Sequence, residues 1–272
     1  NFANKEAVAL LGYSLKLAMK LASSSERNRI ELDALSALGV PLIAVHGYGA
    51  PEVEGNFRRA LALCDALSVG PGQRFALLRG LWNCLYDRSE LSQSLSLAHT
   101  LVELAAQTGN PRNMAYAYRA LGSSFKVTGK LSDARESFQK VLDQPQWWSD
   151  AAARVVHGES PEVIAMTYQA WIACLQGRVD SGLVLVENAV IQAQTIGVPI
   201  ASVFAKCIVQ IVLAFRRDVT NCARRAKQMM QITDEQGFVF WHAHSMIFSG
   251  WAQAHASTDP VAVEQVRCGL DA

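Results

Sequence analysis

The histidines of this sequence are the first candidates for metal binding or acid–base catalysis. His242 and His244 are two residues apart, so on a helix they point in different directions and cannot hold one metal ion as an i, i+4 pair could. His46 stands in a glycine-rich turn, where a solvated imidazole is far commoner than a ligand. The sequence contains no G-x-S-x-G nucleophile motif and no G-x-x-x-x-G-K-[ST] phosphate loop. We therefore expect no catalytic residue, no metal and no cofactor, and we predict that the chain is not an enzyme.

The cysteines point to packing and not to chemistry. The six of them are spread along the chain, and no two form a C-x-x-C motif. Most stand in apolar stretches, where a reduced cysteine acts as a small hydrophobic side chain. This usage favours a reducing, cytoplasmic compartment.

The charge balance excludes a strong electrostatic attraction to nucleic acid or to an anionic membrane. The 272 residues carry 25 basic and 24 acidic side chains, for a formal net charge of +1, and half of the residues are hydrophobic. The longest apolar runs are too short to span a bilayer. A local basic cluster, for which we favour a solvated helix face over a DNA contact, consists of Arg216, Arg217, Arg224, Arg225 and Lys227.

Apolar residues recur at helical spacing between prolines and glycines, and no stretch shows the alternation of a strand. The apolar segments are about 14–22 residues long, which is a helix length. The chain is therefore predicted to be all-α. The expected helices are 3–22, 26–45, 51–67, 73–87, 89–108, 111–128, 131–143, 161–176, 179–196, 199–216, 219–236, 238–255 and 259–270.

One pair of these helices has the residue spacing of a tetratricopeptide hairpin. Gly122 and Ala134 are the small residues expected where the two helices cross, and Gly129 permits the turn between them. Pro145 ends the second helix. The remaining positions of the pattern are filled by Tyr118, Leu121, Phe125, Phe138 and Val141.

The same hairpin recurs more loosely at a period near forty residues. The place of Gly122 is taken by Gly39, Trp82, Ala170, Gln210 and Gly250, and that of Ala134 by Val53, Ser94, Gly182, Cys222 and Ala262. We predict a right-handed superhelical solenoid of tetratricopeptide-like hairpins. Residues 1–272 would form one domain of six hairpins, with a leading helix and an irregular insertion at 144–160.

Four segments resemble a group of bacterial proteins: Leu38-Gly39 with His46–Glu54, Arg79–Trp82, Arg119–Gly122 and Glu235–Phe238. The group is the repeat region that follows the signal-transduction ATPase module in multidomain regulators. Such regulators often carry a class III adenylate/guanylate cyclase domain or a DNA-binding domain. The resemblance implies a sensor or scaffold piece of a larger cytoplasmic signalling protein.

In a tetratricopeptide-like stack, the first helix of each hairpin lines the concave surface. We expect the exposed positions there to lie three before, one after and four after the place of Gly122. Such a face could hold an acidic or C-terminal carboxylate group on Arg79, Arg119 and Lys126, with Trp171 as an apolar anchor. The alternative is that the cations are solvated and the apolar residues pack between repeats. The predicted partner-binding groove consists of Arg79, Asn83, Tyr86, Arg119, Ser123, Lys126, Thr167 and Trp171.

The insertion is a second candidate. It places Trp147 and Trp148 in a connection, followed by Arg154 and His157. Long loops in compact domains are often functional, so this one could cover a ligand or partner site. The alternative is that both tryptophans fill the core between repeats.

Three functions remain open on these grounds. The first is a non-catalytic domain that binds a peptide, a protein or another domain of its parent chain. The second is a small-molecule sensor in which the 144–160 loop closes over a ligand. The third is self-association through end repeats, because helix 3–22 has no partner helix before it.

Overall fold

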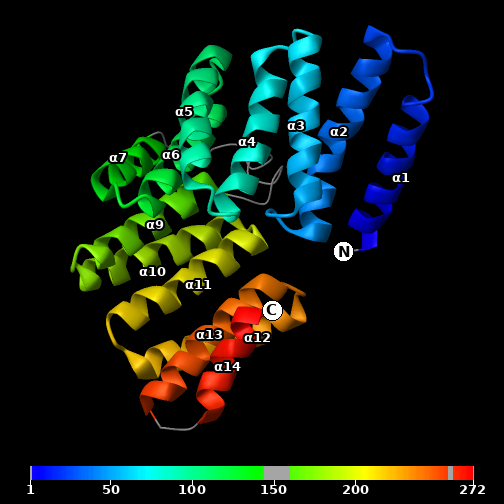
Figure 1. Ribbon diagram of the computed structural model, residues 1–272. Coiled ribbons are helices and arrows are strands. Elements are labelled where there is room, and N and C mark those ends of the chain that lie inside the picture. The colour runs from blue at the N-terminus through cyan, green and yellow to red at the C-terminus, as the bar shows by residue number, and fades with distance from the viewer. Residues whose placement is uncertain (1, 144–159, 257–259, 272) are drawn as a thin grey trace. The chain divides into compact units, whose positions relative to one another are not determined.

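The computed structural model describes residues 2–143, 160–256 and 260–271, and its regular elements there are all helices (Figure 1). The thirteen helices predicted from the sequence are confirmed, and these ranges contain no strand. The helices are α1 (Phe2–Ala18), α2 (Ser25–His46), α3 (Pro51–Ala66), α4 (Pro71–Asp87), α5 (Leu91–Thr108), α6 (Pro111–Val127), α7 (Leu131–Leu142), α9 (Pro161–Leu175), α10 (Val179–Ile196), α11 (Pro199–Phe215), α12 (Val219–Glu235), α13 (Val239–Ala256) and α14 (Pro260–Asp271).

The end of α1 differs most from the predicted bounds. The apolar pattern predicts a helix to residue 22, whereas α1 ends at Ala18. The connection contains Ser24, whose side-chain oxygen accepts a hydrogen bond from the backbone N–H of Arg27 at 3.1 Å. A serine that caps the following helix has an extended backbone, so it cannot continue the preceding helix.

The turns between helices follow the glycines. Five glycines just after the ends of helices have φ values from +60° to +79°, the left-handed region that glycine adopts without strain. Three other turns use Ser68, Ser89 and Arg217 in the same region, with φ of 50°, 59° and 57°. The five glycines are Gly109, Gly129, Gly177, Gly197 and Gly237.

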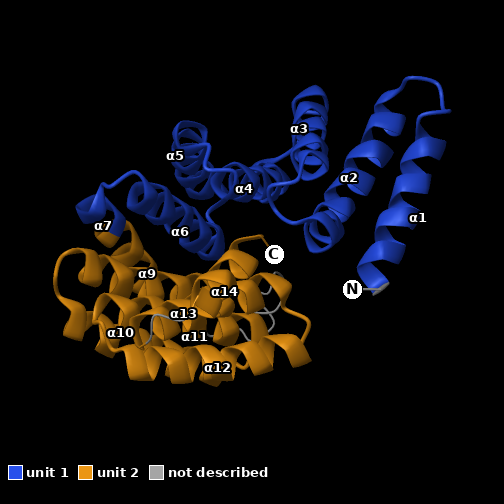
Figure 2. Ribbon diagram, turned by 60° about the horizontal axis from the view of Figure 1, so that its bottom comes forward, with its two compact units in different colours: residues 1–134 blue, residues 135–272 orange. Residues whose placement is uncertain are grey.

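The chain divides into two compact units, residues 1–134 and residues 135–272 (Figure 2). In unit 1, one core cluster includes Leu32, Phe57 and Leu81, and a second includes Trp82 and Leu101. In unit 2, one core cluster joins α9, α10, α11 and α12. Each unit therefore has a hydrophobic core of its own.

The two positions that define the repeat are buried in all six predicted hairpins. At the crossing of α9 and α10, a Cβ atom added to Gly182 would lie 2.6 Å from Cys174 Sγ and 2.9 Å from the Ala170 carbonyl oxygen. At the crossing of α13 and α14, a Cβ atom on Gly250 would lie 2.7 Å from the Ala262 carbonyl oxygen. These two glycines therefore set how closely the paired helices approach.

We expect Gly182→Ala to destabilise unit 2 by about 1–3 kcal/mol, because the new methyl group must push α9 away from α10. Urea unfolding followed by circular dichroism measures the change. The matched control is Gly55→Ala in α3, where no atom lies within 4 Å of the added Cβ. That substitution should stabilise its helix by about 0.5–1 kcal/mol. Equal effects of the two substitutions would contradict the role given to Gly182.

The cysteines are free thiols, and five of the six are buried as expected, whereas Cys268 is exposed. Burial raises the pKa of the Cys207 and Cys222 thiols to about 12, so these two remain protonated and unreactive at neutral pH. Among the described helices, none is both long enough and apolar enough to cross a membrane.

Candidate functional site

Several first helices of neighbouring hairpins pack on each other. In unit 1, α4 contacts α6; in unit 2, α9 contacts α11 and α11 contacts α13. The residues predicted for the inner face therefore stand on adjacent helices. The predicted cations of this face stand in unit 1, whereas Thr167 and Trp171 stand in unit 2.

In unit 1, Arg119 of α6 lies against α4. Its guanidinium carbon is 5.0 Å from the centre of the Trp82 ring, and its Nη1 donates a hydrogen bond to Asn83 Oδ1 at 3.2 Å. Trp82 is itself held in place, because its ring stacks on Tyr86 with ring centres 4.9 Å apart and its Nε1 donates a hydrogen bond to Ser124 Oγ at 3.0 Å. The arginine is therefore fixed by a cation–π contact and an amide, both of which leave its charge in place.

A second guanidinium is held in the same way. Arg79 of α4 lies 4.5 Å from the centre of the Tyr116 ring of α6. Arg79, Asn83 and Tyr86 are half-buried and occupy successive turns of one side of α4. We name Arg79, Asn83, Tyr86, Arg119 and Lys126 the basic face of unit 1.

The expectation that these positions are exposed is wrong for three of the eight residues. Arg119 is 9% exposed, Ser123 1% and Thr167 0%. Thr167 Oγ1 donates a hydrogen bond to the Ile164 carbonyl oxygen of its own helix at 2.9 Å, so this buried hydroxyl is not part of a binding surface. The buried Ser123 hydroxyl has no hydrogen-bond partner among the described residues.

The cation–π pairs between α4 and α6 are offset along the repeat. Trp82 occupies the place of Gly122 in its hairpin, and on α6 it contacts Arg119, three residues before Gly122, as well as Ser124, two residues after it. Arg79 stands three residues before that place and Tyr116 six residues before it, so this pair has the same offset of three residues. The burial of Arg119 follows from its packing against the ring of Trp82.

Lys126 is half-buried at the end of α6, and this burial has an electrostatic consequence. Removal of the ammonium from water lowers the pKa of Lys126 to about 8. The side chain is therefore charged at pH 7 and becomes largely neutral at pH 9.

In unit 2, Trp171 is half-buried against the core, and its ring centre lies 6.2 Å from that of Tyr168. Tyr168 begins a row of rings that crosses three first helices. The ring centres of Tyr168 and Phe204 are 5.7 Å apart, and those of Phe204 and Trp241 are 5.6 Å apart, both pairs edge to face. We name Tyr168, Phe204 and Trp241 the aromatic row. Sequence reasoning missed it because the three residues stand at different places in their hairpins.

His244 lies at the end of the aromatic row. Its ring centre is 5.9 Å from that of Trp241 and 4.9 Å from that of Phe248. Its buried Nδ1 atom has no hydrogen-bond partner among the described residues. Desolvation lowers the pKa of His244 to about 4, so the imidazole is neutral at pH 7.

The first helices of unit 2 carry very little charge. Glu162 is the only charged residue of α9, Lys206 is the only one of α11, and α13 has no Asp, Glu, Lys or Arg. Unit 2 therefore offers an apolar, aromatic surface where unit 1 offers a basic one.

Other predicted sites add no catalytic centre. In the part of the chain that the structure describes, no group of three or more His, Cys, Asp or Glu side chains could hold a metal ion. The basic cluster of α12 and its preceding turn is partly neutralised, since Arg216 pairs with Asp180 at 3.3 Å and Arg225 with Glu187 at 2.7 Å. Four loop candidates lie outside the described residues: Trp147, Trp148, Arg154 and His157.

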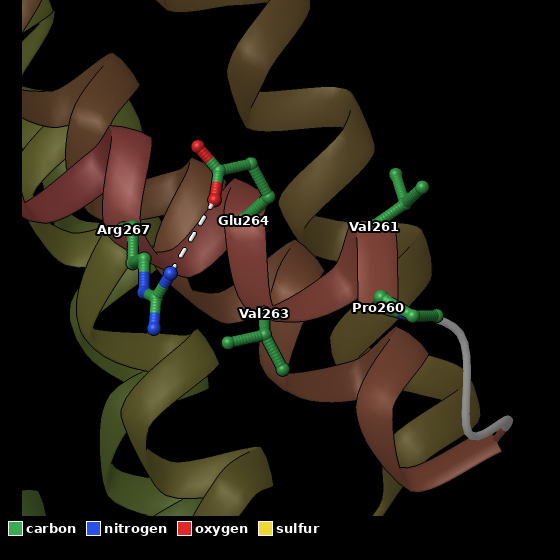
Figure 3. Close-up of a pocket in the computed structure, with 5 residues that line it drawn as sticks. All are labelled: Pro260, Val261, Val263, Glu264 and Arg267. Carbon is green, nitrogen blue, oxygen red and sulfur yellow. Dashed lines mark ion pairs between the residues drawn. The ribbon is translucent and has the colours of Figure 1, made fainter.

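A shallow depression on α14 is lined by Pro260, Val261, Val263, Glu264 and Arg267 (Figure 3). Val261 and Val263 extend to opposite sides of the helix, and Glu264 pairs with Arg267 at 3.8 Å. Since one helix supplies all five residues, they do not enclose a ligand.

Comparison with known proteins identifies the repeat fold. No protein-family model and no curated protein sequence matches the chain. Its structure is similar to that of the Rap conjugation gene regulator of plasmid pLS20 in complex with the Phr* peptide, with a TM-score of 0.68 and 11% identity over 99% of this chain and 69% of that one. The apo form of RapI gives a TM-score of 0.61, with 11% identity over 95% of both chains. A Podosopora anserina kinesin light chain with TPR-like repeats gives 0.52, with 15% identity over 80% of this chain and 99% of that one. The chain therefore has a tetratricopeptide-like repeat fold.

Proposed function

We propose that this tetratricopeptide-like chain is a non-catalytic scaffold that binds an acidic peptide or protein segment on the basic face of unit 1. The observation that carries the proposal is the pair of guanidiniums of Arg79 and Arg119, each fixed over an aromatic ring of the neighbouring helix. Repeat scaffolds of this kind use the first helices of their hairpins for recognition. The similar Rap regulator was solved with a bound peptide, which supports the same use of the fold here.

Stacking on a ring occupies the planar face of a guanidinium and leaves its positive charge able to attract a carboxylate. Fixing the side chain beforehand also reduces the entropy lost when a ligand binds. Arg119 is too buried to contact a peptide directly, so its buried charge contributes only electrostatic attraction. The half-buried Arg79, Asn83, Tyr86 and Lys126 supply the direct contacts.

The biological setting of this binding is a proposal from the sequence. The resemblance to the repeat region of bacterial ATPase regulators supports a cytoplasmic regulatory domain in a larger signalling protein. The bound segment would then belong to a partner protein or to another domain of the same chain. Either would bias the attached effector by binding one of its states more tightly.

The proposal is tested with a fluorescent acidic hexapeptide that has a free C-terminus. We expect Arg79→Glu combined with Lys126→Glu to weaken its binding by about tenfold or more in fluorescence polarisation. The control is Lys227→Glu on α12, an exposed lysine outside the basic face, which should leave the affinity unchanged. Equal losses for both variants would mean that only overall charge matters, and no loss for either would exclude the basic face.

Binding of that peptide is also expected to weaken several-fold as the pH rises from 7 to 9. The pKa of Lys126 is about 8, so this range removes a positive charge from the face. Lys126→Arg should abolish the loss, because an arginine stays charged throughout. Polarisation titrations at pH 7, 8 and 9 measure the effect, and an unchanged pH profile in Lys126→Arg would contradict it.

The aromatic row favours one second candidate, a small-molecule sensor. Tyr168, Phe204 and Trp241 form an uncharged ring surface that suits a planar apolar metabolite. A screen of aromatic metabolites should then change tryptophan fluorescence and raise the Tm of unit 2, both of which Phe204→Ala would abolish. A screen without any shift would exclude this candidate.

A further inference from the structure

Helix α1 has two apolar sides, and only one is used in the fold. Val8, Leu11 and Leu15 pack against the core of unit 1. On the other side, Leu10 is 67% exposed, Tyr13 62% and Leu17 44%. We name Leu10, Tyr13 and Leu17 the outer stripe. In both views of the molecule, α1 is at the end of unit 1, next to α2 (Figures 1 and 2).

Other helices in the same role show that the outer stripe is unusual. Like α1, both α5 and α12 pack on the first helix that follows them. The buried residues of α5 and α12 have the same spacing as Val8, Leu11 and Leu15 of α1. They are Ala98, Leu101 and Ala105 in α5, and Ala226, Met229 and Thr233 in α12. The places of Leu10, Tyr13 and Leu17 are taken by exposed polar residues: Thr100, Glu103 and Gln107 in α5, and Gln228, Gln231 and Glu235 in α12.

Both α5 and α12 have a complete repeat on each side. Even so, the neighbouring helices leave the residues equivalent to Leu10, Tyr13 and Leu17 exposed to solvent. A helix that packed before α1 as in a repeat would therefore leave the outer stripe exposed. α10 has one apolar residue in this row, Ile191, which is 61% exposed. Three adjacent exposed apolar residues, as in α1, indicate a surface that another molecule covers.

The charges beside the outer stripe indicate the chemistry of that molecule. Lys5 and Lys16 are exposed along one edge of the stripe, and Lys20 follows the end of α1. Among the described residues, no ion pair neutralises these three lysines, and the only acid of α1 is Glu6. A second copy of the chain would bring lysines against lysines, whereas an acidic partner would neutralise them.

The shape of the outer stripe fits a helix. Its residues are spaced by three and four, and they cover two turns, about 10 Å, in a line one residue wide. Exposed Met19 and Leu21 extend the apolar surface past the end of α1. Glu6 ends the stripe one turn before Leu10, and Ser14 borders it on one side, so the narrow apolar surface suits the seam of a helix pair better than insertion into a lipid surface.

We propose that the outer stripe binds an amphipathic helix whose apolar seam covers Leu10, Tyr13 and Leu17 and whose acidic edge faces Lys5 and Lys16. This surface is independent of the basic face, so either proposal can fail without the other. It would give the repeat scaffold a second partner, held on the outer side of its first helix.

The probe is a synthetic 21-residue helical peptide with leucine along one seam and glutamate along one edge. We expect it to bind the full chain, and Leu10→Gln combined with Leu17→Gln to weaken binding by at least about tenfold. Both side chains are exposed, so the variant should retain its circular dichroism spectrum and unfolding midpoint. The matched control is Ile191→Gln, an exposed apolar residue at the same place in α10, which should leave the affinity unchanged.

A second peptide with lysine in place of glutamate should bind at least about tenfold more weakly. Equal binding of the two peptides, or binding unaffected by the paired leucine substitutions, would overturn the proposal. Two further results would also overturn it by assigning the stripe to another occupant. One is binding to phosphatidylserine vesicles in place of the peptide, and the other is a dimer in light scattering, each lost in Leu10→Gln, Leu17→Gln.

Discussion

Trp82→Ala is expected to destabilise unit 1 by about 3–5 kcal/mol, the usual cost of removing a fully buried tryptophan. Trp82 is 1% exposed and stands where the other hairpins have mostly small residues, so its ring fills the space between α4 and α6. The substitution also removes the hydrogen bond to Ser124, the stacking on Tyr86 and the platform under Arg119. The arginine would then be a buried charge without its aromatic support.

Trp82→Phe separates these contributions. Phenylalanine keeps most of the ring volume but cannot donate to Ser124, so we expect a smaller loss of about 1–2 kcal/mol. Urea unfolding followed by circular dichroism gives both values, with Trp171→Phe in unit 2 as a half-buried control. If Trp82→Ala costs no more than Trp82→Phe, the ring does not support the packing of α4 on α6.

The helices could be predicted from the sequence because their signals are local. Pro111 fixes the start of α6 and Gly129 the turn that follows it, and both act through the backbone of their own segment. Burial of residues such as Ala134 and Cys222 follows from helical spacing alone. These signals give the number and order of the hairpins without any knowledge of how the hairpins stack.

The candidate faces could be predicted only in part, because they depend on that stacking. The groove residues were predicted to be exposed at fixed places of the repeat, but Arg119 at one such place is buried against Trp82, whose place in the repeat is three residues later. The offset arises from side-chain packing between helices, which a repeat period does not encode. For the same reason Tyr168, Phe204 and Trp241 have no common place in the repeat, although they form one row.

The buried imidazole at the end of that row gives the second large prediction, which concerns stability at acid pH. The pKa of His244 falls from 6.5 to about 4 in the folded chain, so between these values the unfolded state binds a proton that the folded state does not. Folding stability therefore decreases as the pH falls through this range, by about 3 kcal/mol in total. Above pH 6.5 the imidazole is neutral in both states, and His244 makes no contribution to the pH dependence.

His244→Phe should remove this loss while keeping an aromatic ring between Trp241 and Phe248. Acidic residues also titrate below pH 5, so the measured quantity is the difference in unfolding free energy between the original chain and the variant at pH 7, 6, 5 and 4. We expect the unfolding free energy of the variant to increase relative to that of the original chain at each step below pH 6.5. The control is His99→Phe in α5, which replaces an imidazole that is exposed to solvent. A constant difference for His244→Phe would mean that water reaches the imidazole at the end of the aromatic row.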